Sequence, residues 1–208
     1  MTQWYMRVGH VGFNLILLNI LWLAGTLTGF IVLGLFPATM AVVAVVKHMV
    51  LEDDNPPIIK LFLRHFRSNF LMANVFGYVM TSLGVVLTVD LMWVWQMEDS
   101  LLQQCMLGLS VLITLVYLVA CLYLFPIYLH YQFSFKEYFI QAIVLAIGKP
   151  MQTILLLLIV TLISGLYVIF PPLLFVFGLG AIVYPVLKIT CYSFAQKETN
   201  HSDGLYSQ

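Results

Sequence analysis

Long uncharged stretches dominate the chain and alternate with short polar segments. They cover residues 11–46, 68–89, 100–135 and 150–187. A helix needs about 20 apolar residues to cross the hydrocarbon core of a bilayer. The second and third stretches therefore each predict one membrane-spanning helix, and the fourth is long enough for two. The pattern predicts an all-α, polytopic transmembrane helical bundle.

Prolines and glycines divide the first and the last of these stretches. Pro171 and Pro172 lie near the middle of the last one, and proline cannot donate to a helical hydrogen-bond ladder. Gly34 and Pro37 predict a turn within the first stretch. The returning segment, residues 38–49, is short for a full crossing. The chain has six spans if this segment crosses the bilayer, and five if it lies in the interface.

The distribution of charge favours six spans. In that arrangement all nine basic residues share one side, and the opposite side carries Asp90, Glu98 and Asp99. Cytoplasmic loops of membrane proteins are enriched in Lys and Arg, so both chain ends are predicted to be cytoplasmic. Five spans would move Arg7 and the N-terminus outside. The basic residues are Arg7, Lys47, Lys60, Arg64, Arg67, Lys136, Lys149, Lys188 and Lys197.

The composition supports a membrane protein and excludes several other classes. Of the 208 residues, 62% are hydrophobic and 9% are charged, whereas soluble domains carry about 25% charged residues. The net charge is zero, which argues against a nucleic-acid partner. We expect one transmembrane domain over residues 1–196. Residues 197–208 are polar, and we expect them to form a disordered cytoplasmic tail.

Motifs for metal, cofactor or enzyme chemistry are missing from the sequence. Cys105, Cys121 and Cys191 lack the paired spacing of a zinc or redox site. The sequence contains no phosphate-binding loop, no zinc-protease motif, no nucleophile elbow and no dinucleotide fingerprint. We therefore expect no cofactor and no metal, and the prediction is a protein that is not an enzyme.

Residues 58–70 predict an amphipathic helix in the cytoplasmic headgroup layer. Lys60, Arg64 and Arg67 are spaced i, i+4, i+7 and share one helical face, whereas phenylalanines at 62, 66 and 70 line the opposite face. The basic face has three interpretations: contact with anionic lipid, docking of a partner, or binding of a phosphorylated ligand.

A few polar residues lie within or beside the apolar stretches. Asn14 and Asn19 need hydrogen-bond partners that lipid cannot supply, so they either tie helices together or line a polar pathway. Asp90 comes three residues before Trp93, which is typical of the membrane–water boundary. It is interpreted as an acid at that boundary or as an ion or proton site. The small-residue spacing of Gly25 and Gly29 favours close helix packing, within the bundle or in a homo-oligomer.

The first eighty residues resemble the YesL-like family of small bacterial membrane proteins. The resemblance rests on four segments: Asn19-Ile20-Leu21-Trp22-Leu23, Gly34-Leu35-Phe36-Pro37-Ala38-Thr39-Met40-Ala41, a basic end at Lys47, and Phe62-x-x-x-Phe66-Arg67-x-Asn69-Phe70. It implies a bacterial cytoplasmic-membrane protein of uncharacterised function, in a family often associated with carbohydrate uptake. It also implies a structural turn at Pro37, with Thr39 satisfying backbone groups near a helix start.

Two functions follow from these patterns. The first is an accessory or regulatory component of a carbohydrate uptake system of the ABC type. Its expected partners are the lipid bilayer and an ABC transporter or another membrane protein. The alternative is a small transporter or channel that acts by itself or as a homo-oligomer.

Overall fold

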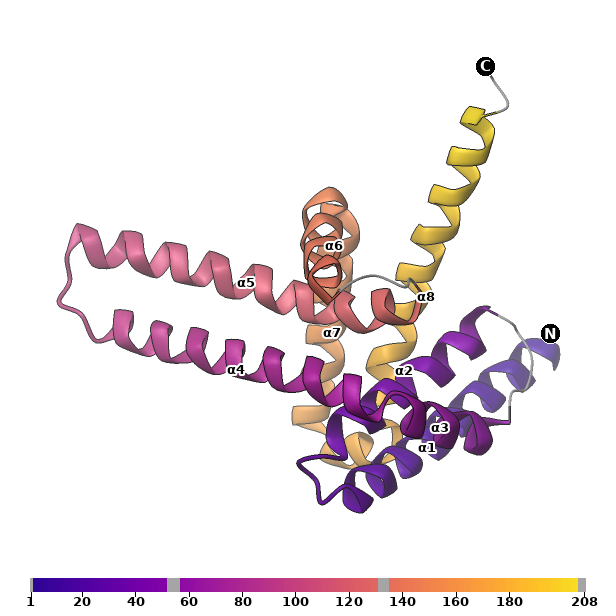
Figure 1. Cartoon of the computed structure of the whole chain (residues 1–208). Coiled ribbons are helices and arrows are strands. Elements are labelled where there is room, and N and C mark those ends of the chain that lie inside the picture. Colours follow the sequence, from indigo (N-terminus) through magenta and orange to yellow (C-terminus); the bar gives the residue numbers. More distant parts are fainter. Residues whose placement is uncertain (1, 52–56, 131–134, 206–208) are drawn as a thin grey trace. The chain divides into compact units, whose positions relative to one another are not determined.

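The computed structural model describes residues 2–51, 57–130 and 135–205, and its regular structure there is α-helical (Figure 1). The helices are α1 (Thr2–Thr28), α2 (Leu35–Leu51), α3 (Ile58–Ser68), α4 (Phe70–Trp95), α5 (Leu101–His130), α6 (Phe135–Gly148), α7 (Pro150–Ile169) and α8 (Pro171–Leu205). The predicted all-α class is confirmed.

Five helical segments in this part of the chain are long and apolar enough to cross a membrane. They are Gly9–Thr28, Phe70–Trp95, Leu101–Leu124, Pro150–Ile169 and Pro171–Thr190. Each begins within two residues of a boundary that the uncharged stretches predict, including the break at Pro171. The chain is therefore a multi-pass membrane protein. In addition to the five candidate spans, it has one shorter apolar helix, the 17-residue α2.

The helices are grouped into two compact units. The first comprises residues 1–71 and 151–208, and the second comprises residues 72–150. The first unit thus contains α1, α2, α3 and α8 with nearly all of α7, and the second contains α5, α6 and most of α4. The single domain expected over residues 1–196 stays a prediction. The disordered tail expected after it also stays a prediction, and α8 is helical to Leu205.

In the first unit, α1 and α2 form a helical hairpin. The turn lies between them, and Phe30 and Ile31 have φ values of 54° and 65°. Residue 34 has no room for a side chain, because a Cβ atom there would lie 2.5 Å from the carbonyl oxygens of Gly25 and Thr26. The turn therefore precedes Pro37, which lies instead in the first turn of α2, where proline is tolerated. The turn predicted near Gly34–Pro37 therefore ends at Gly34, and Pro37 does not form it as the resemblance implied.

α2 forms the core of the first unit. Of its side chains from Pro37 to Val46, all except that of Thr39 are buried, and the helix packs against α1, α3 and α8. Alanine and valine predominate in this segment, and such small side chains allow neighbouring helices to approach closely. Protein therefore surrounds α2 over most of its length.

α3 is amphipathic, as its sequence predicts. Lys60, Arg64 and Arg67 are exposed, whereas Phe62 is only 2% exposed. The rings of Phe62 and Phe66 come within 3.3 Å and 3.2 Å of the position that a Cβ atom would take on Gly25 of α1. Protein rather than lipid therefore covers this part of the aromatic face, and the small residue at 25 serves packing within the unit.

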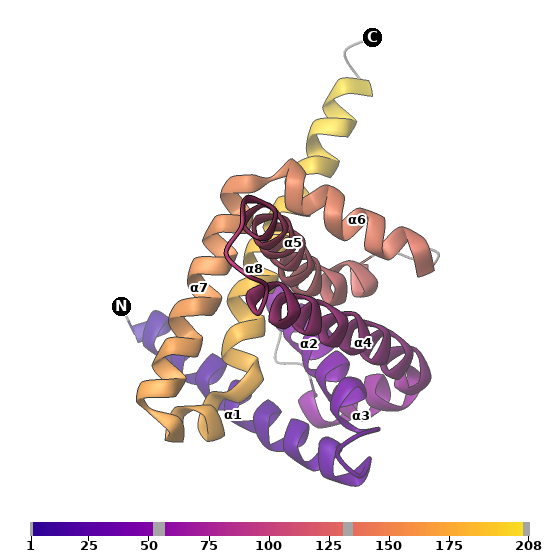
Figure 2. The same cartoon turned by 90° about the vertical axis from the view of Figure 1, so that its left-hand side faces the viewer.

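The remaining helices of each unit pair in different ways. In the first unit, α7 and α8 run side by side and are joined near Phe170 (Figure 2). In the second unit, an aromatic cluster links α4, α5 and α6: the ring centroids of Phe76, Tyr128 and Tyr138 lie 5.3–5.5 Å apart.

Candidate functional site

The most unusual backbone feature of the first unit is a break inside α8. Gly178 has φ 45° and ψ −133°, a conformation that side-chain-bearing residues rarely adopt. In an unbroken α-helix, the carbonyls of Leu174 and Phe175 would accept hydrogen bonds from the N–H groups four residues later. The break at Gly178 coincides with these two hydrogen bonds of the helix. Because lipid offers no hydrogen bonds, carbonyls freed in a membrane span need other donors.

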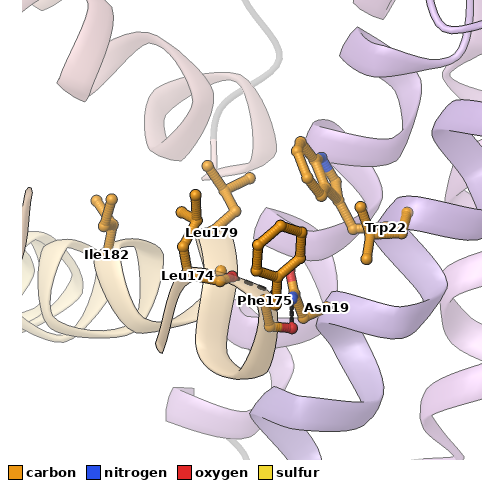
Figure 3. Close-up of a pocket in the computed structure, with 8 residues that line it drawn as sticks. Asn19, Trp22, Leu174, Phe175, Leu179 and Ile182 are labelled. Atoms are coloured by element: carbon orange, nitrogen blue, oxygen red, sulfur yellow. Dashed lines mark hydrogen bonds between the residues drawn. The ribbon is translucent and has the colours of Figure 1, made fainter. Parts of the chain in front are cut away.

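Asn19 of α1 supplies those donors. Its Nδ2 donates to the carbonyl oxygen of Phe175 at 2.5 Å and to that of Leu174 at 3.4 Å (Figure 3). The Asn19 side chain is 2% exposed and lies near the middle of the Gly9–Thr28 span. Asn19 therefore ties α1 to α8, which is the first of the two roles predicted for it.

A residue of α7 donates a hydrogen bond to the main chain of Gly178 itself. The Tyr167 hydroxyl donates to the carbonyl oxygen of Gly178 at 2.7 Å. The Oδ1 atom of Asn19 is buried without a hydrogen-bond partner and lies against Gly178, where an added Cβ atom would overlap it. Glycine is therefore required at 178 both by its φ value and by space.

A pocket of about 180 Å³ lies beside the break. It is lined by side chains of α1 and of both halves of α8: Asn19, Trp22, Leu23, Leu174, Phe175, Gly178, Leu179 and Ile182. Apolar groups make up nearly all of this lining. None of the lining side chains titrates near neutral pH, so the pocket offers no general acid, base or nucleophile.

Trp22 connects this pocket to α2. Its Nε1 donates to Thr39 Oγ1 at 3.1 Å, and the Thr39 hydroxyl donates in turn to the carbonyl oxygen of Leu35 at 2.8 Å. Thr39 thus satisfies a carbonyl at the start of α2 and serves as the acceptor for an indole of α1. The structure brings Asn19 and Thr39 together through Trp22. Asn14 is half-buried, further toward the N-terminus of α1.

Asp90 belongs to the second unit and is exposed near the C-terminal end of α4. Its Oδ2 accepts a hydrogen bond of 2.6 Å from Ser110 Oγ of α5. Trp93 and Trp95 follow it and are 75% and 73% exposed. A second bond between the same helices runs from the Tyr117 hydroxyl to the carbonyl oxygen of Met80 at 2.8 Å.

The basic residues of α3 form a group of their own. Lys60, Arg64 and Arg67 are exposed, as the i, i+4, i+7 spacing predicts. Desolvation by burial lowers the pKa of the neighbouring His65, and the positive charges of Arg64, His48 and Lys47 lower it further.

Sequence reasoning missed Gly178, Tyr167 and Trp22 as members of one site. A glycine inside a helix costs about 1 kcal/mol relative to alanine, so Gly178 within an apolar run was an available signal of a special backbone position. Its partners come from two other helices, and one sequence does not reveal such pairings. Within the described residues, no group of three or more His, Cys, Asp or Glu side chains could hold a metal ion.

Comparison with known proteins finds similarity to one protein family and to three curated relatives. Residues 15–91 match the family described as "Protein of unknown function, DUF624". That range contains Asn19, Thr39, the basic face of α3 and Asp90, but not Gly178. No solved structure matches the chain.

Three relatives come from Bacillus subtilis (strain 168), and each is described as uncharacterized. YesV is 31% identical over 136 residues, which span 65% of this chain and 65% of YesV, just under two thirds of its length. YteU is 25% identical over 96% of this chain and 85% of its own length. YesL is 26% identical over 74% of this chain and 68% of its own length. These similarities confirm the resemblance of the first eighty residues to the YesL-like family of uncharacterised proteins.

Proposed function

We propose that this protein resides in the bacterial cytoplasmic membrane, with its C-terminus in the cytoplasm, as an accessory or regulatory component of an ABC-type carbohydrate uptake system. The placement rests on the one-sided distribution of the nine basic residues. The connection with carbohydrate uptake rests on what the YesL-like resemblance implies.

The observation that carries a partner-binding role is the construction of α3. Three exposed cations share one face of this helix, and its opposite face is anchored by the buried Phe62, with the helix packed against α1 and α2. A charged face on an anchored helix loses little backbone entropy on binding, because its backbone is already ordered. Exposed charges also steer association with an oppositely charged surface. This face suits an acidic patch on the cytoplasmic side of a transporter.

The alternative, a small transporter or channel acting alone or as a homo-oligomer, is favoured by the break in α8. Broken membrane helices mark the substrate sites of many transporters. The pocket at this break is a poor sugar site, however, because its lining is almost wholly apolar. A sugar hydroxyl that enters an apolar pocket without a hydrogen bond loses at least about 1–3 kcal/mol. The pocket therefore supports the accessory role over sugar transport by this chain.

Affinity purification from native membranes, after mild crosslinking, tests the accessory role. The wild-type chain is expected to recover subunits of a carbohydrate ABC transporter. A variant that combines Lys60→Gln, Arg64→Gln and Arg67→Gln is expected to recover far less. Lys188→Gln removes an exposed cation from α8 and serves as the matched control, with recovery unchanged. Wild-type preparations that repeatedly lack every transporter subunit would refute the accessory role, and sugar flux into liposomes containing the chain alone would support the alternative.

A further inference from the structure

We propose that the pocket beside the α8 break binds the hydrocarbon chain of a membrane lipid. This site is lined by residues of α1 and α8 and by none of α3, and it does not depend on the accessory role proposed above. The argument rests on the size of the pocket, its lining and the surface into which it opens.

The size and lining suit hydrocarbon. The pocket holds about 180 Å³ and is lined by leucine, isoleucine and aromatic side chains with almost no polar surface. Apolar cavities of about 150 Å³ with comparable linings stay dry and bind apolar molecules. The one polar side chain in the wall, Asn19, uses its Nδ2 on the α8 carbonyls and has its Oδ1 shielded against Gly178. Neither atom is presented to an occupant.

The surroundings identify the occupant. Leu23 on α1 is 38% exposed, and Leu174 and Phe175 on α8 are 48% and 70% exposed. All three lie in segments that are long and apolar enough to span the bilayer. In a membrane, lipid chains cover such surfaces. Because these three exposed side chains also line the pocket, the pocket opens onto this apolar surface, and a lipid chain can enter it without crossing a polar layer.

The position of the pocket gives binding a structural consequence. Leu174 and Phe175 precede the break, Leu179 and Ile182 follow it, and Trp22 belongs to α1. In a straight α8, the residues before and after Gly178 would not form the same pocket walls. An occupant that touches both halves of α8 therefore binds the broken helix more tightly than a straight helix. Because a ligand stabilises the state that it prefers, a bound chain stabilises the break.

Photolabelling in lipid nanodiscs tests the proposal. The full chain is reconstituted with phosphatidylcholine that carries a diazirine on one acyl chain, and labelled residues are mapped by peptide mass spectrometry. Labelling per residue at Trp22, Leu174 and Phe175 is expected to exceed that at Leu158 and Leu162, which are exposed on α7. An excess of about tenfold corresponds to about 1.4 kcal/mol, which comes from van der Waals packing against the pocket walls because the chain is already surrounded by hydrocarbon in the bilayer.

Two variants narrow the pocket from opposite walls: Leu179→Phe on α8 and Leu23→Phe on α1. Either variant is expected to reduce labelling in the pocket to the level found on α7. If one variant fails to fold, the other still tests the proposal. Leu162→Phe, on an exposed face of α7, is the matched control and should keep the excess. Equal labelling of pocket and α7 in the wild type would overturn the proposal. So would an excess that survives both narrowing variants, or a crosslink in native membranes that places another protein's side chain in the pocket.

Discussion

Two regions of this protein place polar side chains in apolar helices and use them in opposite ways. In the first unit, Asn19 and Tyr167 donate to main-chain carbonyls on either side of a broken helix. In the second unit, Ser110 and Tyr117 of α5 bond to α4, where the helix is continuous. The side-chain bonds of the first unit repair a helix, whereas those of the second connect intact helices.

This difference determines what each bond is worth. The carbonyl of Met80 lies inside a regular helix, where the N–H of Gly84 is its ordinary donor, so it remains bonded if Tyr117 is lost. The carbonyls of Leu174 and Phe175 lie beside the break and accept hydrogen bonds from Asn19, which is 2% exposed. A buried carbonyl left without a donor costs about 1–3 kcal/mol. Substitutions at the break should therefore destabilise the protein more than equivalent substitutions between α4 and α5.

Gly178→Ala should give the largest effect. Alanine is strained by about 1–2 kcal/mol at positive φ, and its Cβ atom would displace the Asn19 amide from its carbonyl partners. We expect a loss of about 2–4 kcal/mol in the free energy of unfolding, measured by denaturant titration in detergent micelles.

Gly108→Ala in α5 is the matched control for that substitution. A Cβ atom at Gly108 meets no other atom within 4 Å, and the residue lies inside a regular helix. Alanine there should stabilise the protein by about 0.5–1 kcal/mol, because glycine loses more backbone entropy on folding. Similar losses for both variants would show that the α8 break is not a special point in the fold.

Asn19→Leu should rank second. It removes both donor hydrogens from the α8 carbonyls while keeping a side chain of similar size, so we expect a loss of about 1–3 kcal/mol in the free energy of unfolding. Asn14→Leu, on a half-buried position of the same helix, should change stability much less. A stability for Asn19→Leu equal to that of the wild type would contradict the repair role, since the carbonyls would then have found other donors.

How much of this contrast could be predicted from sequence depends on the range of each interaction. The uncharged stretches predict the spans well, because length and hydropathy alone decide whether a helix suits a bilayer. The exposed basic face of α3 follows from i, i+4, i+7 spacing, which is a property of one helix. Asn19 and Asp90 could be singled out because polar groups in apolar runs need partners.

The partners themselves could not be predicted. Asn19 bonds to carbonyls 155 and 156 residues away, and main-chain carbonyls carry no sequence signature. The aromatic face of α3 was predictable, but not that Gly25 of α1 would meet it in place of lipid. The turn was predicted near Gly34–Pro37 and ends at Gly34, because Pro37 is equally acceptable in a turn and in the first turn of a helix.

A pair of tyrosines allows the two regions to be compared by one chemical change. Tyr167→Phe removes a donor to the Gly178 carbonyl at the break, and Tyr117→Phe removes a donor to the Met80 carbonyl in a continuous helix. Interhelical hydrogen bonds in membranes average about 0.6 kcal/mol and reach about 1.7 kcal/mol. We expect Tyr167→Phe near the upper value and Tyr117→Phe near or below the average, in the same unfolding assay. The reverse order would remove the contrast between the two regions.

Asp90→Asn should have the smallest effect, and it tests whether Asp90 does more than connect two helices. The asparagine carbonyl can still accept the hydrogen bond from Ser110. Because Asp90 is exposed, its charged carboxylate has a small desolvation cost, and removing the charge gains little free energy. We expect a change within about 0.5 kcal/mol, whereas Ser110→Ala should cost about 0.6 kcal/mol by deleting the donor. Growth of a strain carrying Asp90→Asn should match the wild type across external pH. A growth defect that appears only at one end of the pH range, with stability unchanged, would identify Asp90 as a proton or ion site and place function in the second unit.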